Sequence, residues 1–224
     1  MFGWDTDQNG FAQTHGETSA SVQAANALSG HGLVSGTKIA SALGWRPVEA
    51  VAAGDKVLTF DHGMQVVTDV RRKTFRVNPG ANEPRSLPVT VPVGAMGNRV
   101  PLTLLPEQGV MVESDAACDA QGDPFAIVPA SALVDFRGIS SQYNSGDLEI
   151  VTLYFAKPQV IYAEAGALIY CPAAPVDLLE MFDPTAQVYD MLTAQDAARL
   201  VECMQYEDLT AAYRASGQVA AYAA

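Results

Sequence analysis

Few residues of this chain could do chemistry, and few of those stand together. Nucleophilic catalysis needs a serine, threonine or cysteine beside a base that takes its proton. Ser35 and Thr37 lie in one short stretch, but the nearest histidine, His31, ends a polar leader, His15 lies further back, and His62 falls in a predicted turn. A serine without a base is a weak nucleophile. These two hydroxyls are therefore fallback candidates only.

Cysteine chemistry is not indicated either. The chain has three cysteines, Cys118, Cys171 and Cys203. They are far apart and odd in number, and no Cys-x-x-Cys pair suggests zinc. We expect reduced, ordinary thiols and no disulfide framework.

Three aspartates recur at intervals of four, Asp115, Asp119 and Asp123. They suggest either a cation site or an exposed acidic turn. Their spacing differs from that of a calcium loop, which favours the turn. The chain also lacks a His-Glu-x-x-His pair, a phosphate loop and a Gly-x-Ser-x-Gly elbow. We therefore predict no metal and no cofactor.

Composition narrows the class of protein. The chain has 224 residues, 49% of them hydrophobic and 17% charged, as expected of a globular domain with or without an appendage. The net charge of −12 argues against nucleic-acid and anionic-membrane partners. Neither a secretory signal nor a membrane-spanning run is evident. This predicts a cytoplasmic protein, with non-classical export left open.

Residues 36–63 read as strand, turn, strand, turn, strand. Glycines punctuate runs of β-forming residues, with turns at Leu43-Gly44, at Gly54-Asp55 and after Phe60, where the strand Lys56–Phe60 ends. Pro47 cannot donate to a ladder, so it suits an edge or a corner.

Further strands follow, and helices close the chain. Alternation predicts a half-buried strand at 65–71, with Val66, Thr68 and Val70 on one face, and a solvated basic rim, Arg71–Lys73, at its end. The two prolines of segment 87–93 favour an edge position. A further strand is predicted at 149–155. A short helix is predicted at 176–182. A second helix, at 193–204, has a Thr193–Asp196 cap and an apolar stripe of Ala197, Leu200, Val201 and Met204. A weaker pattern through Leu209, Ala212 and Tyr213 predicts a third helix at 207–216, which Gly217 ends. We expect the apolar stripes to pack on the β-domain.

The 36–63 stretch resembles the opening of the Hint domain, the fold of inteins and of the autoprocessing part of hedgehog proteins. The closest likeness is to the free-standing bacterial subfamily, which begins Cys-Phe-x-x-Gly-Thr and continues through Arg-Pro-Val-Glu into Gly-Asp-x-Val-Leu-Thr. The matching residues are Gly36, Thr37, Arg46, Pro47, Val48, Glu49, Gly54, Asp55, Val57, Leu58 and Thr59. Further likeness lies at 101–113, 130–138 and 156–164.

The resemblance implies a mainly β, Hint-type fold with a C-terminal α-helical appendage. It divides the chain into a flexible polar leader (1–31), a Hint-like β-domain (32–174) and a C-terminal helical segment (175–224). It also places the family's processing centre. The family's nucleophile aligns with Gly32, its hydroxyl residue with Leu105, its first histidine with Gln108, its aspartate with Ala156 and its second histidine with Pro158.

None of these five residues can do the family's chemistry. Glycine has no side chain with which to attack, and glutamine cannot transfer a proton. We therefore expect a catalytically inactive Hint-fold protein, a structural or interaction subunit that binds another protein or a larger bacterial assembly. The alternative is an autoprocessing domain that cleaves its own leader with Ser35 or Thr37.

Overall fold

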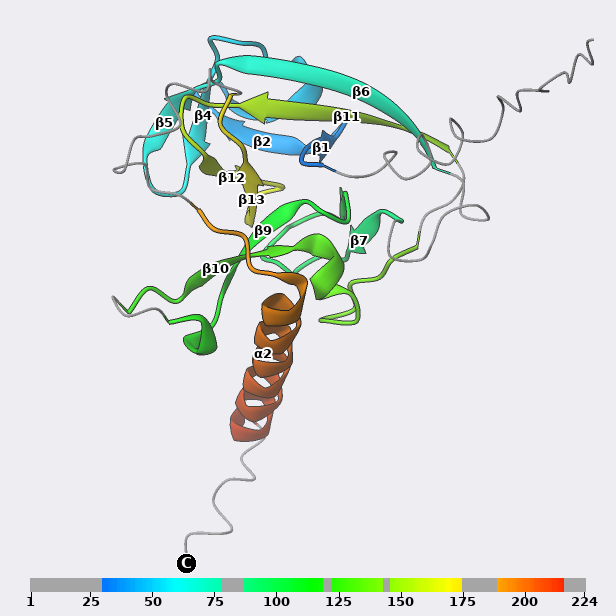
Figure 1. Cartoon of the computed structure of the whole chain (residues 1–224), viewed down its shortest axis with the longest axis vertical. Helices are drawn as coiled ribbons and strands as arrows, with labels where there is room; N and C mark the ends of the chain where they lie inside the picture. Colours follow the sequence, from blue (N-terminus) through cyan, green and yellow to red (C-terminus); the bar gives the residue numbers. More distant parts are fainter. Residues whose placement is uncertain (1–29, 78–86, 119–121, 143–145, 175–188, 216–224) are drawn as a thin grey trace, which may run out of the picture.

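Two antiparallel sheets form the body of the protein (Figure 1). The computed structural model describes residues 30–77, 87–118, 122–142, 146–174 and 189–215. The first sheet has the order β6 (Asp69–Val77), β11 (Gly146–Tyr154), β1 (Leu33–Val34), β8 (Leu102–Leu104) and β7 (Val89–Val91). The second has the order β10 (Phe125–Pro129), β9 (Gly109–Glu113), β13 (Ala167–Cys171), β12 (Gln159–Ala163), β2 (Lys38–Ser41), β4 (Lys56–Thr59) and β5 (Gly63–Val66), with β3 (Gly44–Pro47) paired to β2. The predicted mainly β fold is confirmed.

The opening stretch folds as its glycines predict. β2 and β3 meet at the Leu43-Gly44 turn, and Gly54 starts the turn that leads into β4. The short 3-10 helix η1 (Val48–Ala50) joins β3 to that turn and buries Val48. Pro47 ends β3, which pairs with β2 alone and lies at an edge as expected.

The single strand predicted at 65–71 is wrong. β5 ends at Val66 and β6 begins at Asp69, and these strands belong to different sheets. Between them the Val67 amide donates to the Asp55 carbonyl and the Thr68 amide to the Tyr154 carbonyl, so the chain crosses from one sheet to the other. Val67 is buried and Val66 exposed, the reverse of the expected face. Local alternation cannot show a change of sheet.

β6 and β11 form a long two-stranded ribbon across the top of Figure 1. Their register pairs Asp69 with Tyr154 and Val77 with Gly146. The predicted strand 149–155 is therefore present, and it begins earlier. The Arg71–Lys73 run is exposed, as a solvated rim should be, but it lies inside β6 and not at its end.

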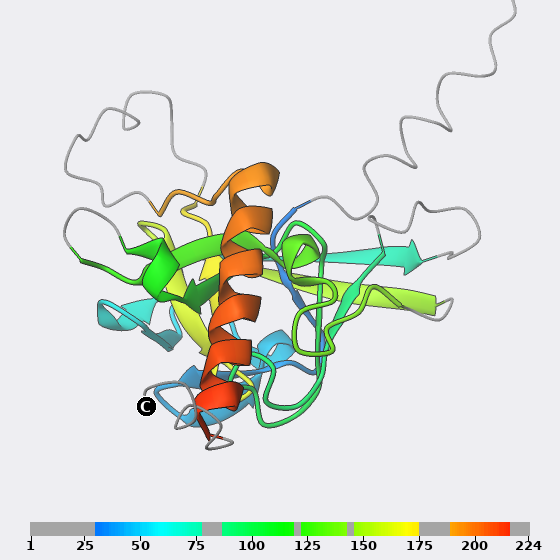
Figure 2. The same ribbon diagram turned by 90° about the horizontal axis from the view of Figure 1, so that it is seen from below.

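The helices predicted at 193–204 and 207–216 are one continuous helix, α2 (Ala194–Ala215). Thr193 caps it, because its Oγ1 accepts from the Asp196 amide and donates to the Asp196 carboxylate. The stripe from Ala197 to Met204 is buried against the domain as predicted. In Figure 2, which views the protein from below, α2 lies in front of the sheets.

The distal half of α2 does not pack as expected. Leu209 is 69% exposed and Tyr213 51% exposed. Polar contacts hold the helix at the turn after Met204: Ser114 donates to Glu207, and Arg137 pairs with Asp208 at 2.5 Å. The helix predicted at 176–182 and Gly217 lie outside the described residues. No helix within the described ranges is long and apolar enough to cross a membrane.

Two more short 3-10 helices border the helix α2. η3 (Asp115–Ala117) follows β9, and η4 (Ala130–Leu133) follows β10. The edge segment predicted at 87–93 is the three-residue strand β7, at the end of the first sheet. Prolines at positions 88 and 92 flank it, which accords with an edge position.

Candidate functional site

Gln108 contacts the residue aligned with the family's nucleophile. It lies in the turn between β8 and β9 and is completely buried. Its Oε1 accepts a hydrogen bond from the Gly32 amide at 2.7 Å. Its Nε2 donates to the carbonyls of Gly109 (3.0 Å) and Tyr170 (2.8 Å). Both amide donors and the amide oxygen are thus engaged inside the protein, and neither atom can accept a proton as a histidine would.

Thr152 holds the other side of the same peptide bond. Its Oγ1 donates to the His31 carbonyl oxygen at 2.8 Å. The register between β1 and β11 pairs Leu33 with Val151, so Gly32 faces Thr152 on the neighbouring strand. The His31–Gly32 peptide therefore has its N–H bound to one side chain and its C=O to another. We call this peptide with the Gln108 amide and the Thr152 hydroxyl the peptide clamp.

The space beside Gly32 is already filled. A Cβ atom at this position would lie 2.5 Å from Ile150 Cγ2 and 2.8 Å from Thr152 Oγ1. Gly32 also has a φ of +156°, which L residues seldom adopt. A cysteine or serine in this position would have to displace its neighbours before it could attack any carbonyl.

His31 is half-buried at the end of the clamp, although it was predicted to belong to the leader. Its ring meets the edge of Tyr170 with 5.2 Å between the centroids. Its Nδ1 is buried and has no hydrogen-bond partner among the described residues. Burial lowers the pKa of His31, while the nearby Glu107 carboxylate raises it in part. The net lowering favours the neutral imidazole.

The other three aligned positions differ in their distance from the clamp. Leu105 is buried in a small apolar cluster with Ile150, whose side chain borders Gly32, so it stands close by. Ala156 is exposed and Pro158 half-buried, both between β11 and β12. Among the described residues, no hydrogen bond or ion pair links either of them to the clamp. The structure thus brings Gly32, Leu105 and Gln108 together and leaves Ala156 and Pro158 outside.

The fallback hydroxyls lie beyond the far end of β1. Ser35 follows Gly32 by three extended residues, a separation of about 10 Å. Its hydroxyl donates to the Glu49 carboxylate, which also accepts from the Gly36 amide at 2.7 Å. Burial alone would raise the pKa of Glu49, but these hydrogen bonds and the Arg72 charge hold it below its ordinary value. Glu49 is consequently a weak base for Ser35.

Thr37 is buried and forms part of the backbone turn into β2. Its amide donates to the Val34 carbonyl, and its carbonyl accepts from the Val48 amide. The backbone amide of the next residue, Lys38, donates to the Glu164 carboxylate, and the Lys38 carbonyl accepts from the Glu164 amide. The Gly-Thr pair therefore serves the turn geometry here.

The residues that sequence analysis missed are Thr152, Ile150 and Tyr170. Thr152 and Ile150 fall on the face of β11 opposite Val151 and Leu153, so strand alternation alone places them together. Nothing local indicates that this face meets Gly32, because Thr152 and His31 are 121 residues apart. Only the pairing of β1 with β11 would reveal the contact.

The remaining candidates show no second centre. The three cysteines are free, and burial raises the pKa of Cys171 to about 12. Asp115 and Asp123 are exposed, and Asp119 lies outside the described residues. Where side chains are described, no cluster of three or more histidine, cysteine or acidic residues could hold a metal ion. His62 is exposed in its turn, with its Nδ1 3.0 Å from Gln159 Oε1.

Comparison with known proteins identifies a family. Residues 31–168 match the family model described as Hint domain. Among curated proteins, no sequence significantly matches this chain.

Solved structures of inteins and intein-like domains are similar to the chain. A GSH-linked, splice-inactive variant of the AceL NrdHF class 3 split intein has 15% identity and a TM-score of 0.40, covering 65% of this chain and 100% of that one. A bacterial intein-like domain from Clostridium thermocellum has 12% identity and a TM-score of 0.39, covering 63% and 99%. The gp41-1 intein has 11% identity and a TM-score of 0.38, covering 64% and 99%.

Proposed function

Because the chain belongs to the Hint domain family, we propose that it is a catalytically inactive Hint protein, a structural or interaction subunit of a bacterial assembly. In this proposal the former processing centre holds the peptide before residue 32 and does not release it. The proposed partner is another protein. Neither nucleic acid nor a membrane suits a chain with a net charge of −12.

The peptide clamp is the observation that carries the proposal. Cleavage needs a nucleophilic atom close to the carbonyl carbon and a group that moves protons. Gly32 supplies no such atom, and the volume that one would occupy holds Ile150 and Thr152. Gln108 supplies no base, and all its hydrogen-bonding groups are engaged. Hydrogen bonds that bind the ground-state peptide without a nucleophile stabilise the intact bond and do nothing to break it.

The mass of the intact protein tests this proposal. The freshly purified full-length chain is measured, then incubated with dithiothreitol or hydroxylamine and measured again. We expect a single unchanged mass, because no ester or thioester forms that these reagents could cleave.

Loss of 31 to 36 residues, which corresponds to a cut before a residue between Gly32 and Thr37, would contradict the proposal. Ser35→Ala and Thr37→Ala are the matched controls. If one of them abolished such a product, the chain would be an autoprocessing domain with that hydroxyl as its nucleophile.

A further inference from the structure

β6 is an outer strand with one open side. It is the last strand of the first sheet, and in the described part of the chain its backbone pairs with β11 alone. At nine residues it is far longer than β7, the three-residue strand at the opposite edge. An open edge presents unpaired N–H and C=O groups that can accept another strand. β6 therefore offers a long template for strand addition.

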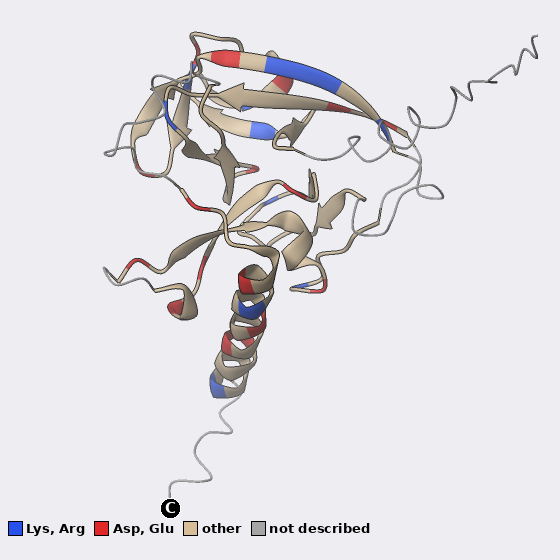
Figure 3. Ribbon diagram, in the orientation of Figure 1, with Lys and Arg blue, Asp and Glu red and all other residues tan. Residues whose placement is uncertain are grey.

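Basic side chains mark this strand. Arg71, Arg72, Lys73 and Arg76 are all exposed, and Figure 3 shows the blue band of the Arg71–Lys73 run on β6. Four cations within nine residues are unusual in a chain whose net charge is −12. A second copy that paired with this edge would set cations against cations, which is unfavourable. Charge therefore disfavours self-pairing and selects an acidic occupant.

The carboxylates that pair with two of these cations are exposed too. Arg71 bonds to Asp69 at 3.0 Å and its side chain is 58% exposed. Arg76 bonds to Asp147 at 3.1 Å and is 82% exposed. Ion pairs at such sites contribute little free energy. A carboxylate on an added strand can therefore compete for either guanidinium at small cost.

Further contacts fix three of the basic side chains. The Arg71 guanidinium lies 4.9 Å from the centroid of the Tyr154 ring, and the Lys73 ammonium lies 4.5 Å from that of Phe75. Arg72 donates to the carbonyls of Glu49 and Val51. Alternation puts Arg71 and Lys73 on one face of the strand and Arg72 and Arg76 on the other. Cations thus flank the open backbone edge on both faces.

We propose that the open edge of β6 binds an extended acidic segment of a partner protein, which adds to the first sheet as a further strand. This inference rests on the proposed interaction function and names the chemistry of the partner. Main-chain hydrogen bonds would give the affinity, and carboxylates opposite the four cations would give the specificity. The strand would span about nine residues, the length of β6.

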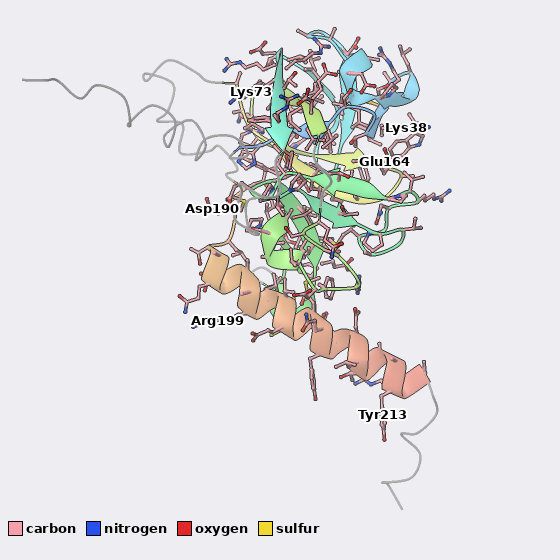
Figure 4. The ribbon with its side chains drawn as sticks, turned by 90° about the vertical axis from the view of Figure 1, so that its right-hand side faces the viewer. Lys38, Lys73, Glu164, Asp190, Arg199 and Tyr213 are labelled. Atoms are coloured by element: carbon pink, nitrogen blue, oxygen red, sulfur yellow. The ribbon has the colours of Figure 1, made fainter. Side chains whose placement is uncertain are left out.

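A model peptide tests the proposal. The probe is a fluorescein-labelled, end-capped peptide of alternating glutamate and threonine, about nine residues long, and anisotropy is measured with the full chain. We expect saturable binding that Arg71→Glu with Lys73→Glu weakens at least about tenfold. The matched control is Lys38→Glu with Lys56→Glu. It changes the net charge equally at exposed lysines of β2 and β4 and should leave the affinity within about twofold. Figure 4 shows Lys38 on the opposite side of the molecule from Lys73.

Backbone methylation separates strand addition from simple charge attraction. One further peptide keeps every carboxylate and carries an N-methyl group on every residue, so neither edge of the strand can donate a main-chain hydrogen bond. This peptide should bind at least about tenfold more weakly than the parent peptide.

Equal binding by the methylated and the parent peptide would overturn the proposal, as would absence of binding by the parent peptide. Tighter binding of a single-stranded oligonucleotide that depended on Arg71 and Lys73 would also overturn it. The intact mass of the same preparation keeps the two proposals apart. If the chain is uncut and does not bind the peptide, only the proposed β6 site is refuted. If the chain is cut, the proposed inactive-domain function is refuted.

Discussion

Thr152 and Arg71 stand opposite each other on neighbouring strands, yet their polar groups act in different directions. The Thr152 hydroxyl turns inward and holds the His31 carbonyl. The Arg71 guanidinium stays at the surface, where it pairs with the exposed Asp69 and lies over the Tyr154 ring. One ribbon of two strands therefore contributes to the peptide clamp through one strand and presents a charged edge through the other.

Substitutions in these two regions should affect different properties of the protein, its stability at the clamp and its binding at β6. Polar atoms of the peptide clamp are buried and fully used within the protein, so their loss leaves partners without hydrogen bonds. Polar atoms of β6 are solvated, so their loss costs the fold little. Changes at the clamp should therefore lower stability, and changes at β6 should alter only what the protein binds.

The largest effect is expected from Gln108→Leu. The substitution removes the Gln108 hydrogen bonds of the Gly32 amide and of the Gly109 and Tyr170 carbonyls. The free energy of unfolding should fall by about 3 kcal/mol or more, as measured by chemical denaturation. Gln65→Leu is the control, because Gln65 makes one exposed hydrogen bond to the His62 carbonyl and its loss should cost about 0.5 kcal/mol. Equal effects of the two changes would show that the buried hydrogen bonds of Gln108 contribute no more to stability than an exposed one.

Gly32→Ala should be the next most damaging change. The added methyl would meet Ile150 and Thr152, and such overpacking costs about 2 kcal/mol. Ile150→Ala opens that space, so the double variant should be more stable than the sum of the single effects by about 1 kcal/mol. Strictly additive effects would show that Ile150 does not crowd position 32.

His31 should make stability depend on pH. Burial lowers its folded-state pKa below the unfolded value of about 6.5. Below that pH the unfolded state binds more protons, so the free energy of unfolding falls until the folded-state pKa is passed. His31→Gln should flatten this slope between pH 7.5 and 5.5. Glu107→Gln should extend the fall in stability to lower pH, because the Glu107 charge raises the folded-state pKa of His31 in the unaltered protein. An unchanged slope in both variants would contradict the buried position of His31.

The smallest effect is expected at the β6 edge. Arg76→Ala removes a solvated ion pair with Asp147 and should change the free energy of unfolding by about 0.5 kcal/mol or less. A loss comparable with that of Gln108→Leu would mean that the edge is part of the folded core's support and not a free surface.

The sequence was most informative where local signals and family likeness agree. Glycine punctuation located β2, β3 and β4, and the aligned positions led to Gln108 and Gly32, which do meet in the structure. The residues that close the centre were not predictable, because Thr152 meets His31 through a strand pairing across 121 residues.

Other failures have equally physical causes. Alternation placed Val66 on one face with Thr68 and Val70, because a local pattern does not show that the chain changes sheet after β5. Helix periodicity divided α2 in two because Glu207 and Asp208 interrupt its apolar stripe. In the structure these acids bond to Ser114 and Arg137, and the helix continues through them.

Hydrogen exchange at the Gly32 amide shows whether the clamp holds the His31–Gly32 peptide. If the clamp holds the His31–Gly32 peptide, this amide should exchange as slowly as amides of β11, while that of the exposed Gly30 exchanges rapidly. Gln108→Leu should remove the protection at Gly32 before that of β11. Exchange at Gly32 as fast as at Gly30 in the unaltered protein would show that the peptide is not held, and the account of a centre converted from cutting to holding would be wrong.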